Sequence, residues 1–507
     1  MTQTAARECR RHIRSARVVA GAVLAAIFSL GLLGCEANRR ARKDLAAALA
    51  HYERQRTSDA EAYAGTAPEA ASRGRSGPPA SAPAATPDAT ESEPRSLREL
   101  ILVALERNPE IQAARQIAQA QAARVPQVTA LRDPILKMKV MPEPVRTAEG
   151  DNYFVLGIQQ KLPIPQKLDR RGRIALAEMR MALEKLGATR LRVIADVKRA
   201  YYRLYVIDRT IEIETANRDL LRGLIDAVQA QVAVGGRSQA DLLRAQVEFS
   251  TLESQLIELR RKRRSAVAML NRLLNRRPQD PIGPTPEVPP RHVEIALRRL
   301  LGEAQRANPE LKQLARRIER QRAALELAQL GSWPDFTLGL EWIQIDPRDA
   351  FQPPPNPQTG IRPPAPKLSE DGSDNWAITL SMNLPIWQQR VQAAIRAARR
   401  RLYAAQHDLV AARDRVQFQV ADALLRVHEQ QQLVDLFKNT IIPQARQTYE
   451  VSRAAYTAGR GDFLTVIDNW RKWLAFSIQY RRAIGETERA VADLEEALGL
   501  SLVEAKQ

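Results

Sequence analysis

The sequence contains few of the residues on which enzyme active sites and metal centres depend. Only 2 of its 507 residues are cysteine and 5 are histidine. The histidines lack the spacing of metal ligands, since they stand at His12, His51, His292, His407 and His428. A Gly-x-Ser-x-Gly elbow, a glycine-rich phosphate loop and a His-Glu-x-x-His helix are also missing from the sequence. These absences predict a protein that is not an enzyme, has no metal site and needs no cofactor.

Aromatic residues are scarce as well, at 5% of the chain, while Ala, Arg, Leu, Gln and Glu dominate. Such a composition is typical of long helices and coiled coils. The formal charge of +19 and the pI of about 10.3 could suggest a nucleic-acid partner. The arginines are interleaved with Glu, Asp and Gln, however, as on solvated helix faces, so no nucleic-acid partner is predicted.

Neither glycine nor proline occurs between Trp387 and Ile442, and this predicts one very long helix. Pro443 predicts a kink, Gly459-Arg460-Gly461 a turn, and residues 462–498 a returning helix. Apolar or small residues follow the four-three spacing of a coiled-coil seam, at Val391, Ile395, Ala398, Leu402, Ala405, Leu409, Ala412 and Val416. A hairpin of this length has too few partners in its own chain to form a compact globule.

The N-terminus has the pattern of an export signal. Arginines precede an apolar run at residues 18–33, and Gly34-Cys35 follows, so residues 1–34 are predicted to be a signal peptide. The run Leu32-Leu33-Gly34-Cys35 resembles a bacterial lipobox, with Leu33 where a smaller residue is more usual. The resemblance implies that Cys35 carries acyl chains such as palmitate and anchors the chain to the outer membrane. An uncleaved membrane anchor is the alternative. Residues 35–95, rich in Pro, Ala, Ser and Gly, are predicted to be a lipid-anchored segment and disordered linker.

From Ser96 onward the chain repeats one pattern. Asn108-Pro109-Glu110 recurs as Asn308-Pro309-Glu310, each with Asn as the expected N-cap and Pro in the first turn. Each copy continues with a helix, two strands, a very long helix, a glycine turn and a returning helix. We therefore predict two repeats, 96–276 and 291–507, joined by a proline-rich linker at 277–290.

The strands alternate apolar residues with small or polar ones, for example Leu136, Met138 and Val140 with Lys137 and Lys139. The pattern favours membrane-barrel strands, and a soluble sheet packed on the helices is the alternative. Because open edges are not tolerated in lipid, several subunits would have to complete the barrel. The stretches 141–152 and 346–374 are predicted to be loops outside the cell. Met138 and Met141 could act as soft metal ligands, but ordinary strand packing is the preferred interpretation.

This ordered duplication, with Ile442-Pro443-Gln444-Ala445, Tyr456-Thr457-Ala458-Gly459 and Ala497-Leu498-Gly499-Leu500, closely resembles the outer-membrane efflux protein family typified by TolC. The resemblance implies a mainly α fold with a β-barrel part. In it, a trimeric twelve-stranded outer-membrane β-barrel continues into a long periplasmic α-helical barrel, built from two internal repeats. It also implies a homotrimer that is the passive exit duct of a tripartite efflux or type I secretion system. The implied partners are a periplasmic adaptor, an inner-membrane transporter and outer-membrane lipid. The alternative function is a lipid-anchored periplasmic coiled-coil adaptor or scaffold.

The resemblance also assigns residues. It places the periplasmic tip, where the adaptor docks, at two glycine turns formed by Gly235, Gly236, Arg237, Gly459, Arg460 and Gly461. Asp241, Tyr456 and Asp468 match positions of the closed gate. For Asp241 and Asp468 an ordinary structural role, such as complementing a helix dipole, remains an equal alternative. Thr465 and Gly461 depart from the family pattern, so the gate bonding is expected to differ. The transported substrate is not readable from the sequence.

Overall fold

The computed structural model describes residues 39, 43–47, 50, 96–147, 150–233, 238–346, 354–361, 372 and 374–502. The predicted signal peptide, Cys35 and the first tip turn (Gly235, Gly236 and Arg237) lie outside these residues. The chain forms two compact units. We call Met1–Ala46, Gln119–Arg180 and Arg316–Gln406 the sheet unit, and Ala47–Ala118, Met181–Ala315 and His407–Gln507 the hairpin unit.

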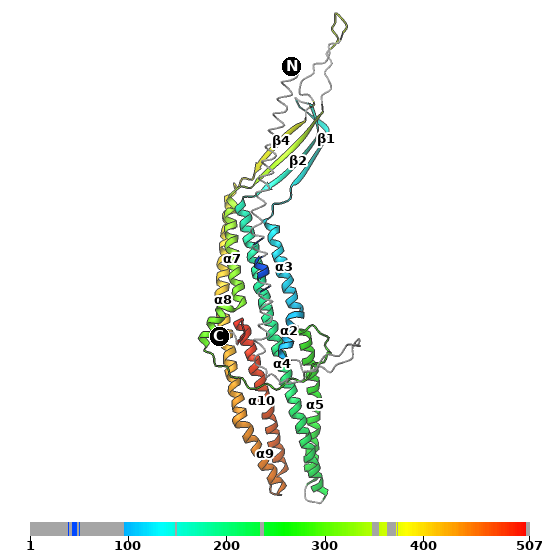
Figure 1. The fold of residues 1–507 in the computed structure, drawn as a ribbon, viewed down its shortest axis with the longest axis vertical. Helices are drawn as coiled ribbons and strands as arrows, with labels where there is room; N and C mark the ends of the chain where they lie inside the picture. Colours follow the sequence, from blue (N-terminus) through cyan, green and yellow to red (C-terminus); the bar gives the residue numbers. More distant parts are fainter. Residues whose placement is uncertain are drawn as a thin grey trace, which may run out of the picture. The chain divides into compact units, whose positions relative to one another are not determined.

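The sheet unit contains one antiparallel four-stranded sheet (Figure 1). Its strands lie in the order β1 (Ile135–Thr147), β2 (Gly150–Leu162), β3 (Phe336–Asp346) and β4 (Asn375–Met382). Leu156 of β2 lies opposite both Met138 of β1 and Trp342 of β3, and Trp342 lies opposite Trp376 of β4. The two strand pairs, which are separated in the sequence by residues 163–335, therefore join through β2 and β3, and β1 and β4 form the sheet edges.

The predicted loop at 141–152 is wrong, because strand β1 continues to Thr147 and β2 begins at Gly150. The pairing register is irregular between Val140 and Val145, around Pro142 and Pro144. A proline has no amide hydrogen to give to a strand partner, and such residues occur at bulges and edges. The bulge interrupts the alternation of side chains, and the strand therefore could not be recognised from its pattern. In the predicted loop at 346–374, the described residues 354–361 contain turns and neither helix nor strand.

Glu178 of α4 (Pro165–Ala233) links two other helices of the sheet unit. Its carboxylate accepts a hydrogen bond from Arg124 of α3 (Pro109–Thr129) at 2.9 Å and one from Arg320 of α7 (Pro309–Gln329) at 2.8 Å. A short 3-10 turn, η1 (Leu330–Ser332), leads from α7 toward β3, and α8 (Gln388–Leu436) follows β4.

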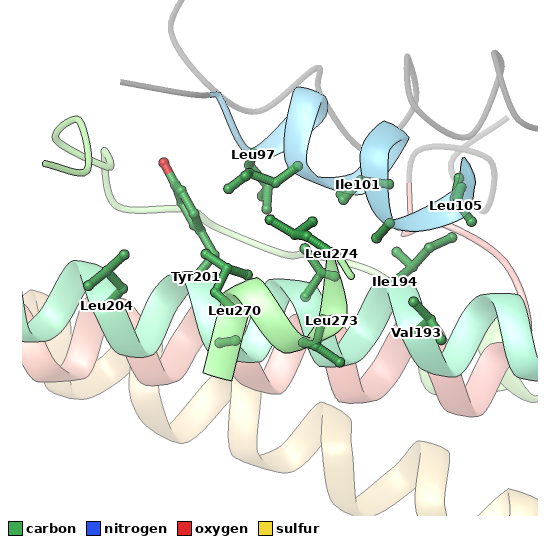
Figure 2. Close-up of a cluster of buried hydrophobic side chains, with 14 of the residues drawn as sticks. Leu97, Ile101, Leu105, Val193, Ile194, Tyr201, Leu204, Leu270, Leu273 and Leu274 are labelled. Atoms are coloured by element: carbon green, nitrogen blue, oxygen red, sulfur yellow. The ribbon is translucent and has the colours of Figure 1, made fainter. Parts of the chain in front are cut away.

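The hairpin unit is helical and has its core between neighbouring helices. Besides the later part of α4, it contains α2 (Leu97–Arg107), α5 (Gln239–Leu273), α6 (Leu297–Ala307), α9 (Ile442–Thr457) and α10 (Phe463–Leu498). Figure 2 shows one apolar cluster, in which α2 packs on α4 and α5 through Leu97, Ile101, Leu105, Val193, Ile194, Tyr201, Leu204, Leu270, Leu273 and Leu274. A second cluster joins α6 to α8 and α10. Within the described residues, no helix combines the length and hydropathy that a membrane span requires.

The two asparagine caps are confirmed. The Asn108 side-chain oxygen accepts from the Glu110 amide at 2.9 Å, and the Asn308 oxygen accepts from the Glu310 amide at 2.9 Å. Each side-chain amide also donates to a carbonyl at the C-terminal end of another helix. Asn108 donates to Leu273 O of α5 at 2.9 Å, and Asn308 donates to Ala497 O of α10 at 2.8 Å. Each asparagine therefore begins one helix and ties it to the end of another.

The long helix is also confirmed, with a distortion just before the proline. Helix α8 passes into a π-helical turn, η2 (Phe437–Ile441), and then into α9. Pro443 lacks an amide hydrogen and its ring would clash with the carbonyl one turn back, and the wider π turn accommodates it. All predicted seam residues from Val391 to Val416 are buried or half-buried within this single chain.

Candidate functional site

One face of the sheet is apolar and uncovered. Phe336 and Leu340 of the central strand β3 are 37% and 36% exposed. Eight further large apolar side chains of this face are between 46% and 70% exposed, namely Leu136, Met138, Val140, Ile158, Trp376, Ile378, Leu380 and Met382. The interpretation as a soluble sheet packed on the chain's own helices is therefore wrong. An apolar face of this extent is suited to lipid, and the alternation along the strands places it on one side only.

The opposite face is polar and crowded at its glycines. A Cβ on Gly339 would lie 2.3 Å from the Thr379 hydroxyl oxygen, and one on Gly157 would lie 2.8 Å from Glu341 Cγ. Side chains of the adjacent strands therefore occupy the space above these positions, and only glycine, which has no Cβ, fits there. The sheet thus has a lipid-compatible face and a polar face, as a strand pair in a water-filled barrel requires.

An ion cluster holds the point where strands become helices. Lys167, in the first turn of α4, donates to the Asp335 carboxylate and to the Trp333 carbonyl, both at 2.8 Å. Lys161 of β2 lies 3.5 Å from the same carboxylate, and the Asp335 amide donates to Asn383 at 2.6 Å. Lys167 is buried, and it shares Asp335 with Lys161. The cluster therefore holds Asp335, which precedes β3, next to the end of β2.

The structure does not favour Met138 and Met141 as a pair of metal ligands. Met138 lies on the exposed apolar face, opposite Leu156. Met141 follows Val140, where the pairing becomes irregular, and its side chain is half-buried, so the two methionines have different surroundings. Ordinary exposure on the lipid-compatible face accounts for Met138.

The second tip turn is well defined. Gly459 has a φ of 78°, its amide donates to Tyr456 O at 3.0 Å, and the Arg460 amide donates to Ala455 O at 2.9 Å. These two bonds make a Schellman motif, which needs a left-handed residue and therefore favours glycine. Gly461 follows against the end of α9, since an added Cβ would lie 2.9 Å from the Tyr456 amide nitrogen.

The three gate candidates have different surroundings. Tyr456 is 2% exposed, and its ring centre lies 5.4 Å from that of Phe463 across the turn. Asp241 stands in the first turn of α5, 3.8 Å from Arg244. Asp468 is exposed and lies 3.0 Å from Lys472, one helical turn further along α10. Within one chain, Tyr456 is therefore a core residue, and both aspartates have a helical partner of their own.

Sequence reasoning missed a set of buried charges in the hairpin unit. Lys198 of α4 pairs with Glu495 of α10, and both side chains are less than 10% exposed. Glu488, two helical turns earlier on α10, lies 3.5 Å from Arg291, the first residue after the linker. Burial raises the pKa of Glu488, and the nearby Arg291 and Lys198 oppose this effect. The available signal was the spacing of Glu488 and Glu495, which places both carboxylates on the apolar stripe of α10.

The linker between the proposed repeats is held by another buried acid. Asp208 of α4 accepts from the Thr285 amide at 2.9 Å, the Thr285 hydroxyl at 3.1 Å and Arg263 of α5 at 2.7 Å. Arg209 donates to the Thr285 carbonyl at 2.8 Å. The linker is therefore a fixed part of the hairpin unit, although its sequence resembles a loop.

Glu214 of α4 is a buried acid of a different kind. It is 5% exposed, and its Oε2 atom has no hydrogen-bond partner in the described part of the chain. Burial raises the pKa of Glu214 to about 7. This carboxyl group can therefore change its protonation state near neutral pH.

The fold is that of outer-membrane channels. It superposes on the outer-membrane channel OprN over 80% of this chain and 90% of that one, with a TM-score of 0.64 and 17% identity. CusC, described as forming a transmembrane channel, gives 0.65 and 16% over 80% and 92% of the two chains. The outer membrane protein VceC of Vibrio cholerae gives 0.63 and 18% over 80% and 96%.

The sequence gives the family. The outer membrane efflux protein model matches residues 100–276 and 300–500, and the chain belongs to this family. A relative, the cobalt-zinc-cadmium resistance protein CzcC of Cupriavidus metallidurans, is 24% identical over 383 residues, which cover 72% of this chain and 83% of that protein. The chain is an outer-membrane efflux channel and not an enzyme. Members of the family are trimeric channels that work with periplasmic adaptors and inner-membrane transporters.

Proposed function

We propose that three copies of this chain form the exit duct of a tripartite efflux system and conduct its cargo passively across the outer membrane. The sheet carries this proposal. Its apolar face is exposed, and edge strands β1 and β4 have no outer partner within the described chain. Unpaired strand edges are not tolerated in lipid, and four strands are too few to close a barrel. Pairing β4 of one copy with β1 of the next in a closed ring satisfies both requirements.

Purified protein should therefore be a trimer in detergent and should give stepwise conductance in a planar bilayer. Size-exclusion chromatography with light scattering measures the first property, and single-channel recording measures the second. A folded trimer without conductance would overturn the channel proposal. A folded monomer that is extracted without detergent would favour the periplasmic scaffold.

The lipid face can be tested with one matched pair of substitutions on β4. Leu380 lies on the exposed apolar face, and Ala377 lies on the other face, opposite Glu341. Leu380→Lys places a charge in lipid, which costs about 2–4 kcal/mol near the bilayer centre. The Leu380→Lys variant should thus assemble poorly in the outer membrane, while Ala377→Lys should assemble normally. Equal assembly of the two variants would contradict the assignment of faces.

We further propose that the turn at Gly459, Arg460 and Gly461, with its counterpart at 235–237, forms the adaptor-docking tip, and that Asp241, Tyr456 and Asp468 contribute to the gate. The Schellman turn supports a defined tip shape. Asp468→Ala should raise conductance if this carboxylate closes the gate between subunits. Lys472→Ala removes the same helical ion pair but keeps the carboxylate, so it should leave the gate closed. A rise in both variants would show that the pair only stabilises α10.

The N-terminal assignments form a separate proposal. We propose that residues 1–34 are removed, that Cys35 is acylated, and that the repeats comprise 96–276 and 291–507 with 277–290 between them. The twofold occurrence of the order helix, helix, strand, strand, long helix, returning helix supports the repeat boundaries. Metabolic labelling with a palmitate analogue should mark the wild type and not Cys35→Ser. Labelling of both proteins would reject this site.

The cargo is proposed from the relative alone. Because that relative is named for cobalt, zinc and cadmium resistance, these ions are the first candidates. A strain that lacks the gene should become sensitive to them, and the wild-type gene should restore growth. Unchanged sensitivity to all three ions would redirect the search to other cargo.

A further inference from the structure

The hairpin unit contains a groove whose charge is strongly unbalanced. The groove lies between α4, α5 and α10 and has a volume of about 540 Å³. Five of its lining side chains are cationic, namely Arg203, Arg261, Lys262, Arg482 and Arg489. Only one, Glu486, is acidic. Like charges collected around one small volume repel each other unless a counter-ion enters.

Most of this positive charge is not neutralised by the protein. Arg489 pairs with Glu486 at 2.6 Å, and Lys262 pairs with Glu258 at 2.9 Å. Arg203, Arg261 and Arg482 have no ion pair within the described residues, although Arg261 interacts electrostatically with Glu258, the partner of Lys262. In addition, the Nε atom of Arg489 is buried without a hydrogen-bond partner there. Several guanidinium donors are therefore available to a ligand.

A second groove of the same unit shows that this imbalance is not general. It is lined by two cations, Arg199 and Arg426, and by four acids. Arg199 pairs with Asp493 at 2.6 Å, and Arg426 pairs with Asp422 at 2.7 Å. The overall positive charge of the chain therefore does not explain the first groove, because this second groove is neutralised within the protein.

The groove lies on a defined face of α4. Tyr205 and Arg209 face the linker, as shown by the packing of Tyr205 near Val288 and the bond from Arg209 to Thr285. Ala200, Arg203, Val206 and Ile207 line the groove from α4. At 100° per residue Ala200, Arg203 and Ile207 are about half a turn away from Tyr205 and Arg209, while Val206 lies at the border and also packs in the apolar cluster of Tyr205. The linker therefore covers one face of α4, and the groove opens on the opposite face.

We propose that this groove is a binding site for a small oxyanion with two or more negative charges, of the pyrophosphate type. Arginine suits this ligand class because its planar guanidinium donates two parallel hydrogen bonds to one oxyanion group. Arg203, Arg261 and Arg482 come from three different helices, so they can surround an anion from several sides.

The site has a consequence for conduction, and this consequence rests on the proposed trimeric channel. The face of α4 that carries the linker has an extra layer of chain and fits the outside of a helical tube. The groove then faces the interior, where a bound polyanion reduces the flow of ions. Binding itself requires only the folded hairpin unit and does not depend on channel activity.

The test uses the full-length protein in detergent and pyrophosphate as the probe. Isothermal titration calorimetry at low salt should show saturable binding to the wild type. Replacing both Arg203 and Arg482 by Gln should weaken binding by roughly tenfold or more, because hydrogen bonds to charged groups are lost. The control is Arg260→Gln with Arg264→Gln, two exposed arginines of α5 that do not line the groove.

The outcomes distinguish a specific binding site from nonspecific attraction of the anion by the net positive charge. An equal loss of affinity in the control would overturn the proposal, because net charge alone would then explain binding. Binding to the wild type that does not saturate would also overturn it. In a planar bilayer, pyrophosphate should lower the conductance of the wild type more than that of the Arg203→Gln, Arg482→Gln variant. Unchanged conductance despite measured binding would overturn the interior position of the groove and leave the site itself intact.

Discussion

Glu214 gives the sharpest test of the energetics of the hairpin unit. The side chain is buried in α4, and Asn217, less than one turn further on, accepts a hydrogen bond from Trp470 of α10 at 3.0 Å. Burial, which disfavours the charged carboxylate, is the cause of its raised pKa. The substitution to test is Glu214→Gln, which keeps the shape of the side chain and mimics its protonated form.

The sign of the effect follows from the two pKa values. The ordinary pKa is 4.5 and the folded-state value is about 7, so the folded protein holds an extra proton between these pH values. As the pH rises from 4.5, Glu214 therefore lowers the free energy of unfolding progressively below its value in acid solution. The full reduction is present above pH 7. The cost is about 3 kcal/mol per subunit, since one pKa unit is about 1.4 kcal/mol.

The assay is thermal unfolding of the detergent-solubilised protein, followed by circular dichroism between pH 5 and pH 8.5. The Gln variant should match the wild type at the acidic end and exceed its Tm by a few degrees at the alkaline end. Exposed Glu429 of α8 provides the control, because Glu429→Gln makes the same chemical change at a position outside the core. Taking differences from the wild type cancels the titration of all other groups.

Two results would refute the reasoning. A difference in Tm between Glu214→Gln and the wild type that does not vary with pH would mean that Glu214 titrates normally. A wild type that becomes relatively more stable at alkaline pH would mean that Glu214 has a cationic partner in the assembled protein.

Two further predictions concern the contact between α4 and α10. Lys198→Met leaves Glu495 buried without its cation and should lower the free energy of unfolding by about 3–5 kcal/mol. Adding Glu495→Gln to this variant should recover much of the lost stability. No recovery in thermal unfolding would contradict the ion-pair explanation. Gly485→Ala would place a Cβ 2.3 Å from Val206 Cγ2 and should lower the free energy of unfolding by about 1–3 kcal/mol. Gly223→Ala adds a Cβ with no neighbouring atom within 4 Å and should stabilise α4 by about 1 kcal/mol. A shift of both Tm values in the same direction would disprove the packing argument.

The features that sequence predicted well depend on nearby residues. The caps at Asn108 and Asn308 need only the next few backbone amides, and the structure contains both. The turn at Gly459 likewise follows from a local conformational requirement. The long helix α8 follows from the absence of glycine and proline between Trp387 and Ile442. In each case the interaction that decides the structure lies within one or two helical turns.

The features that sequence missed depend on distant partners. The cation for Glu495 is Lys198, 297 positions away, and the acid that holds Thr285 is Asp208, 77 positions away. A pattern can show that Glu488 and Glu495 stand on an apolar stripe, but it cannot identify the opposing side chain. The basic groove is a similar case, because its unpaired arginines come from three helices and meet only in the fold.

The buried charges provide a reason for the unique alignment of these long helices. A seam of Ala, Leu and Val residues can pair in several registers with little change in buried area. Sliding α10 along α4 by one heptad would bury Glu495 without Lys198, and an unpaired buried charge costs several kcal/mol. The Asp208 contacts with Arg263 and Thr285 act in the same way between α4, α5 and the linker. We infer that these polar contacts contribute less to the overall stability than to the choice of one register. A single register is what a channel tip requires, because it determines which residues meet at the constriction.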